Sequence, residues 1–134
     1  MMMKMIDEFN QWIAANRAYM GKVRTLLEKP MPDQEEALLE HLRLVEAHYA
    51  RMGCLLAEVN SILDRAISGF YQINSGREWT VNEKKAACDS EVSQVREARD
   101  KVVSIEEAIS TRISLGQSIM KQQRGERMNA SHTS

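Results

Sequence analysis

The sequence predicts an all-α protein: a long antiparallel helical hairpin of the coiled-coil type with an additional N-terminal helix. Of the 134 residues, 5% are aromatic, 43% hydrophobic and 28% charged, a balance typical of long helices. Two prolines and six glycines leave few places for the chain to turn. Apolar residues also recur at alternating spacings of three and four, which is the heptad pattern of packed helices.

The first helix is predicted over residues 1–29. Its apolar positions alternate spacings of three and four, provided that Asn16 fills one position of the seam: Ile6, Phe9, Ile13, Met20, Val23 and Leu27. Two interpretations of Asn16 stay open. It is either a polar core residue that fixes register or oligomeric state, or a residue rotated to the rim of the helix packing.

A proline-containing linker is predicted over residues 30–33. Pro30 and Pro32 lack a backbone donor, and each disfavours helix in the residue before it. Asp33 and Glu36 have the spacing of a capping box, which predicts that the second helix begins here.

The second helix carries the most regular pattern in the chain. The alternation of four and three holds without a break through Leu38, Leu42, Val45, Tyr49, Met52, Leu56, Val59, Leu63, Ala66 and Phe70. Apolar residues beside this seam, among them Leu55 and Ile62, indicate that the helix contacts more than one neighbour. Gly53 costs the helix about 1 kcal/mol relative to alanine, and a close helix crossing would explain its presence.

A loop is predicted near residues 71–80, and Thr80 with Glu83 forms a second capping box that begins the third helix. The hairpin then covers residues 34–125. Two successive three-residue steps, at Val95 and Ala98, predict a locally overwound seam. The polar residues 126–134 are predicted to form a disordered tail.

The short loop makes the two long helices antiparallel neighbours, each roughly 55–65 Å long. Two such helices cannot enclose a core, so their apolar faces must be covered by the first helix, by other copies or by a partner. We expect a homo-oligomer, and the predicted interface consists of Ile13, Asn16, Met20, Leu56, Val59, Leu63, Val102 and Ile109.

The sequence offers no catalytic, cofactor or metal motif, and we predict that the protein is not an enzyme. His41 and His48 share a helix face but lie about 10 Å apart, too far for one metal ion without other ligands. The formal net charge of −1 creates no global attraction to nucleic acid or to an anionic membrane. No signal peptide or membrane span is evident, and Cys54 and Cys88 are expected to be free thiols, so a cytoplasmic location is expected (the host cytoplasm if a phage encodes the chain).

Aromatic and basic residues alternate around the predicted loop. Single-stranded nucleic acid is bound by such combinations, because bases stack on aromatic faces while phosphates pair with cations. For Phe70 and Trp79 the alternative is a structural role in closing the end of the hairpin core. With the basic end of the third helix, the candidate nucleic-acid-binding residues are Tyr71, Arg77, Lys84, Lys85, Arg112, Lys121 and Arg124.

The stretch from Trp79 to Ala86 (WTVNEKKA), with Asp89 and Val92 after it, resembles the C-terminal helix of small helical-hairpin proteins of bacteriophages, the T-even (UvsY-like) recombination mediators. Arg112-Ile113 and Ile119-Met120-Lys121 add to the resemblance, which covers about residues 38 to 125. It implies a ring-forming helical protein that binds single-stranded DNA and helps to load a recombinase. The chain departs from the family in its second helix, where the mediators carry a basic cluster and this sequence has only Arg43, Arg51 and Arg65 among many acids.

Two functional hypotheses follow. The first is a phage-type recombination accessory protein that binds single-stranded DNA and a recombinase. The second is a protein-binding module, such as a phage inhibitor of a host defence complex or an assembly chaperone. It would act through an exposed apolar seam, or through the acidic face around residues 33–46, toward a partner with a basic surface.

Overall fold

The computed structural model describes residues 2–133, with side chains from residue 6 to residue 130, and consists of four helices. These are α1 (Met2–Glu28), α2 (Glu35–Ile73), α3 (Val81–Glu91) and α4 (Ser93–Thr133). No strand occurs between residues 2 and 133, and the all-α prediction is confirmed.

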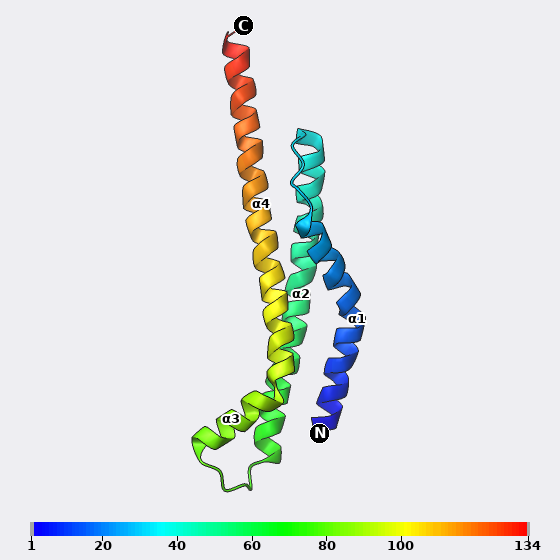
Figure 1. Cartoon of the computed structure of the whole chain (residues 1–134), viewed down its shortest axis with the longest axis vertical. Helices are drawn as coiled ribbons and strands as arrows, with labels where there is room; N and C mark the ends of the chain where they lie inside the picture. Colours follow the sequence, from blue (N-terminus) through cyan, green and yellow to red (C-terminus); the bar gives the residue numbers. More distant parts are fainter. Residues whose placement is uncertain (1, 134) are drawn as a thin grey trace.

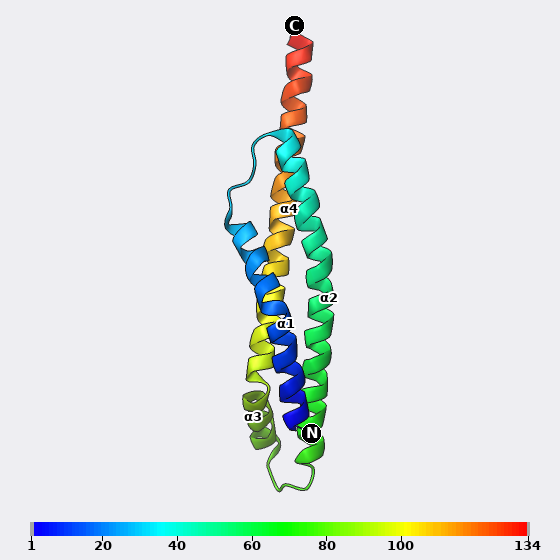
Figure 2. The ribbon, with the colours of Figure 1, turned by 90° about the vertical axis from the view of Figure 1, so that its right-hand side faces the viewer.

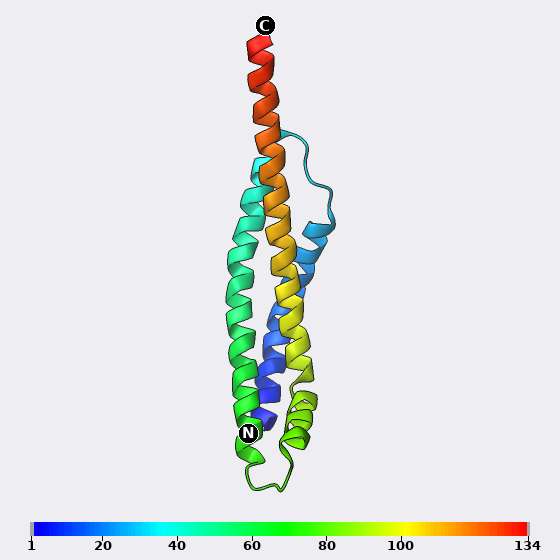
Figure 3. The same ribbon diagram turned by 90° about the vertical axis from the view of Figure 1, so that its left-hand side faces the viewer.

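The long helices α2 and α4 lie side by side in opposite directions and form the body of the molecule (Figure 1). α1 runs antiparallel to α2 along the half of this pair that lies nearer the α2–α3 loop (Figure 2). Beyond the end of α1, the linker rises along the pair to the start of α2, and the C-terminal end of α4 projects past that start (Figure 3). At 1.5 Å per residue, the 39 residues of α2 and the 41 of α4 extend about 58 and 62 Å.

The core follows the heptad seams and is completed by α1. Val45, Met52 and Val59 of α2, with Val102 and Ile109 of α4, are fully buried. α1 contributes another group of buried side chains: Phe9, Trp12, Met20 and Val23.

The seam of α2 differs from the prediction on one side. Leu55 and Ile62, placed beside the seam, are buried, whereas the seam residue Tyr49 is 45% exposed. α1 and α4 both pack against α2, so the buried face of α2 is wider than a two-helix seam.

Most residues predicted to form an interface between copies lie inside one chain. This corrects the prediction for Met20, Val59, Leu63, Val102 and Ile109, which are in the core that the three helices of a single chain enclose. Ile13 and Leu56 are half-buried against the same core. The Asn16 amide donates to the Trp12 carbonyl oxygen at 2.8 Å, so Asn16 bonds within its own helix.

The third predicted helix is divided in two, and its end lies further on than expected. α3 ends at Glu91, where the Val92 N–H donates to the Cys88 carbonyl at 3.0 Å and the Ser93 hydroxyl donates to the Ser90 carbonyl at 3.0 Å. Such a side-chain bond to the preceding turn competes with helical pairing and favours a bend. α3 accordingly turns away from the line of α4 (Figure 1).

Residues 126–133, predicted as part of a disordered tail, continue α4. Arg127 pairs with Glu35 at 2.9 Å, and the Gln123 side chain donates to the Asp33 carbonyl at 2.7 Å. These contacts with the start of α2 support the helix beyond Gly125.

Of the two predicted capping boxes, one is present. The Glu83 N–H donates to the Thr80 hydroxyl, and the Thr80 N–H donates to the Glu83 carboxylate. The N-cap of α2 is Gln34, without a side-chain bond, so the prediction that Asp33 caps α2 is wrong.

Candidate nucleic-acid interface

Phe70 and Trp79 close the end of the hairpin. Their rings stack with centroids 6.1 Å apart at an interplanar angle of 18°, and Phe70 is buried. The Arg77 guanidinium lies 4.9 Å from the centroid of the Trp79 ring, a cation–π contact. Phe70 and Trp79 therefore have the structural role of closing the end of the hairpin core, and the Arg77 side chain contacts Trp79.

Tyr71, Lys84 and Lys85 line one pocket of about 420 Å³ beside this aromatic stack. We call it the elbow pocket; it lies where α2 faces α3, and its remaining lining residues are Ile67, Val81, Cys88, Asp89 and Arg96. Tyr71 is 41% exposed, so its ring is accessible from solvent. Three of the seven residues predicted to contact nucleic acid are thus brought together.

The elbow pocket has an excess of positive charge. Arg96 pairs with Asp89 at 2.9 Å, and the side chains of Lys84 and Lys85 have no ion pair within the described residues. Arg96 was not among the predicted residues. The signal that could have found it is Asp89 seven residues earlier, which faces it across the bend between α3 and α4.

Cys88 is the only thiol that lines the elbow pocket, and it is not activated. Burial raises the pKa of the Cys88 thiol, and the Asp89 carboxylate raises it further. Since the thiolate is the nucleophilic form, Cys88 serves as an apolar lining group. Cys54 lies exposed on α2, and both cysteines are free.

Arg112 is half-buried and makes contacts within the chain. Its guanidinium donates to the carbonyl oxygen of Leu26 at 3.1 Å and to that of Lys29, and it contacts His41 Nε2 at 3.3 Å. These carbonyls belong to the end of α1 and to the linker, so Arg112 caps α1.

Lys121 and Arg124 are exposed but lie at the other end of the molecule. Lys121 is about 38 Å further along α4 than Arg96, at 1.5 Å per residue. The seven predicted residues therefore do not form one surface, because three of them (Arg112, Lys121 and Arg124) are spread along the length of α4. The basic end of α4 does meet the acidic start of α2, as the antiparallel arrangement predicts, through Arg127 and Glu35.

The two helical histidines serve contacts between helices. His48 Nδ1 is 2.7 Å from the Tyr19 hydroxyl of α1, and burial lowers the pKa of His48, with the nearby Arg51 lowering it further. Burial likewise lowers the pKa of His41, and the Arg112 guanidinium adds to the effect. Within the described residues, no group of three potential ligands is placed to hold a metal ion.

Comparison with protein-family models, with curated proteins and with solved structures finds no match to this chain. None of the helices in residues 2–133 has an apolar stretch that could cross a membrane.

Proposed function

We propose that this chain is a non-enzymatic accessory protein of the DNA-recombination type that binds single-stranded DNA at the elbow pocket. The observation that carries the proposal is the convergence of an exposed tyrosine and two unpaired lysines, Tyr71, Lys84 and Lys85, on one pocket. The bacteriophage resemblance of the third helix points to the same class.

The pocket suits a nucleotide of a single strand. A base would stack on the Tyr71 ring and cover the apolar side chains of Ile67 and Val81, while the flanking phosphates pair with Lys84 and Lys85. In a duplex the bases are stacked on one another and the Tyr71 ring has no free base face to meet, so the single strand is preferred. A recombinase is the second partner in this proposal.

One pocket neutralises few phosphates, so affinity per chain is modest. With about 0.7 counterions released per neutralised phosphate of a single strand, two lysines give a slope of log K against log salt of roughly −1.4. Assembly of several copies on one strand raises the overall affinity through effective concentration. A homo-oligomer is therefore part of the proposal.

The test is fluorescence anisotropy with labelled oligo(dT) and a labelled duplex over a salt series, using wild type and two charge-matched variants. Lys84→Glu/Lys85→Glu reverses the charge of the two pocket lysines, and Lys121→Glu/Arg124→Glu makes the same change of net charge at the far end of α4. We expect salt-sensitive binding that prefers the single strand and is lost in the first variant but kept in the second.

Tyr71→Ala separates stacking from charge. Loss of one base–aromatic stack reduces affinity by about 1–3 kcal/mol, roughly fivefold to 150-fold, with an unchanged salt slope. Absence of binding at low salt, or an equal loss in both charge-reversal variants, would contradict the proposal.

A further inference from the structure

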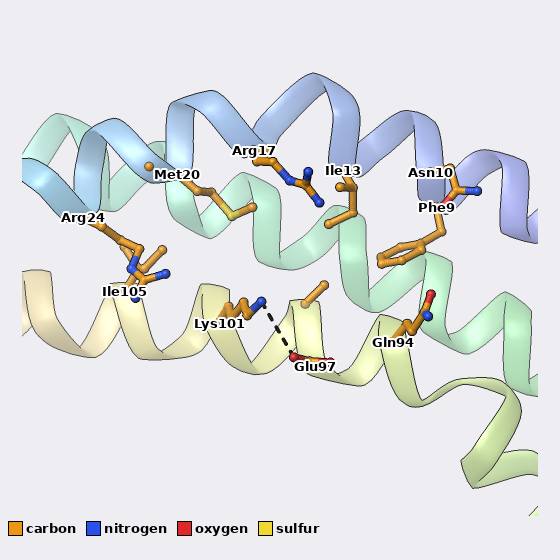
Figure 4. A pocket seen from close by; sticks show the side chains of 12 residues that line it. Phe9, Asn10, Ile13, Arg17, Met20, Arg24, Gln94, Glu97, Lys101 and Ile105 are labelled. Atoms are coloured by element: carbon orange, nitrogen blue, oxygen red, sulfur yellow. Dashed lines mark ion pairs between the residues drawn. The ribbon is translucent and has the colours of Figure 1, made fainter.

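A second open site lies between α1 and α4, away from the elbow pocket. Figure 4 shows side chains of both helices directed into this groove, which has a volume of about 550 Å³. Its floor is apolar: Phe9, Met20, Ala98 and Ile105 line it, each at most 9% exposed, with Ile13 half-buried among them.

The groove is open because α1 is tied to α2. The Trp12 indole N–H donates to Glu58 at 2.9 Å, the Tyr19 hydroxyl meets His48 at 2.7 Å, and the Arg51 guanidinium lies 3.9 Å from the centre of the Tyr19 ring. Among the described residues, the only hydrogen bond between α1 and α4 is that from Arg112 to Leu26, at the C-terminal end of α1. Along the groove itself the two helices are joined by no polar contact.

The two walls carry different charges. On α4, Glu97 and Lys101 pair with each other at 3.8 Å, so that wall is locally neutral. On α1, Arg17 and Arg24 line the groove, are exposed, and form no hydrogen bond or ion pair within the described residues. Both guanidinium side chains extend from α1 toward α4 (Figure 4). The groove thus combines an apolar floor with two unpaired cations on a chain whose net charge is −1.

We infer that the α1–α4 groove binds an acidic amphipathic helix of a partner protein. Arg17 and Arg24 are two helical turns apart, about 10.5 Å, so the occupant carries carboxylates seven residues apart beside an apolar stripe. From Phe9 to Arg24 the groove is roughly 22 Å long and takes about four turns of helix. The docked helix completes a four-helix arrangement in which its apolar residues rest against the apolar floor around the half-buried Ile13.

A helix suits this groove better than a nucleic acid strand does. The only aromatic ring in the lining is that of Phe9, which is 8% exposed and offers no face for a base. The distribution of charge and apolar surface is that of the helix-in-groove mode, where apolar anchors provide affinity and the flanking charges provide orientation.

The test uses the full chain and a labelled synthetic helix. The probe is an amphipathic peptide of about 18 residues with leucines at the a and d positions and a glutamate once per heptad beside them. Two control peptides replace its glutamates by lysines or its leucines by serines. Binding is followed by fluorescence anisotropy.

The protein variants are matched in charge and in exposure. Arg17→Glu/Arg24→Glu reverses the charge of the α1 wall of the groove, whereas Lys22→Glu/Arg43→Glu reverses the charge at two exposed positions outside the groove. Circular dichroism verifies that both variants keep the helical content of wild type. We expect the acidic peptide to bind wild type and the control variant equally, and to lose about tenfold or more on the groove variant, which gains affinity for the lysine peptide.

Three results would overturn the inference: no binding of the acidic peptide, an equal loss in both variants, or binding by the serine peptide as well. Sedimentation velocity detects a fourth result that would overturn the inference. If wild type is a dimer that dissociates in the groove variant, the occupant is a second copy and the partner assignment is wrong. Lys84→Glu/Lys85→Glu leaves peptide binding unchanged, so failure here and failure of DNA binding are separately observable.

Discussion

At the scale of single residues, the glycines mark where helices approach and where they do not. A methyl group at Gly116 of α4 would overlap the side chain of Leu42, which is itself buried. At Gly53 a methyl group would meet only a carboxylate oxygen of Glu106 at 3.8 Å, an ordinary contact, and at Gly21 it would meet nothing within 4 Å. The close helix crossing that would explain Gly53 is therefore found at Gly116 instead.

We predict that substitution by alanine changes the free energy of unfolding in opposite directions at two of these positions. Gly21→Ala raises the free energy of unfolding by about 1 kcal/mol, because alanine has the higher helix propensity and enters open space. Gly116→Ala has the same propensity gain but overpacks Leu42, at a cost of about 1–3 kcal/mol. Urea unfolding of both variants measures the difference, and equal stabilisation would show that α2 and α4 are not in close contact at Gly116.

At the scale of elements, the end of α1 is held by a residue from a different helix. Arg112 of α4 donates to two carbonyls at that end, so it links the termination of α1 to the position of α4. The last turn of α1 has no basic residue of its own to interact with its carbonyls.

Arg112→Met keeps much of the apolar volume but removes these donors. We expect a loss of about 1–2 kcal/mol in the free energy of unfolding, as for hydrogen bonds from a charged donor at a partly exposed site. Amide hydrogen exchange should be faster in the last turn of α1, near Leu26. Arg124→Met, at an exposed position near the end of the same helix, serves as the control and should leave both measurements unchanged.

Elements whose signals are local were predictable. The heptad seam of α2 and the Thr80–Glu83 capping box depend on residues a few positions apart; the capping box is present, and so is the seam apart from the exposed Tyr49 and the half-buried Leu56. The end of α4 was not predictable, because it depends on contacts such as Arg127 with Glu35, which are far apart in the sequence. The candidate site divides in the same way: Tyr71, Lys84 and Lys85 meet across a short loop, whereas the acceptors of Arg112 come from the other end of the chain.

At the scale of the whole molecule, two histidines join the three long helices. His48 of α2 contacts Tyr19 of α1, and His41 of α2 contacts Arg112 of α4. Burial lowers the pKa of both imidazoles below the ordinary value of 6.5, so both are neutral in the folded protein over a wider pH range than in the unfolded chain.

Because the pKa values of both histidines are lowered in the folded protein, the stability of the fold depends on pH. As pH falls below about 6.5, the unfolded chain takes up protons at these positions before the folded protein does, so stability declines. The decline ends once the pH is below the folded-state pKa of each histidine. We expect urea unfolding at pH 7.5, 6.5 and 5.5 (chosen as roughly spanning the titration range of histidine) to show a smaller loss of stability in His41→Gln/His48→Gln than in wild type. Identical pH profiles would mean that the two histidines do not titrate differently on folding.

The two tryptophans lie in different elements, Trp12 in α1 and Trp79 in the α2–α3 loop, and report on different events. Trp12 is 8% exposed and hydrogen-bonded to Glu58, so its emission wavelength follows whether α1 stays seated on α2. Trp79 contacts the Phe70 ring and the Arg77 guanidinium at the loop, so quenching of its fluorescence follows events at the elbow pocket. Single-tryptophan variants, made by replacing the other indole with phenylalanine, would separate the two signals. A shift in the emission wavelength of Trp12 would report on the packing of α1 against α2, and a change in the emission intensity of Trp79 would report on the loop.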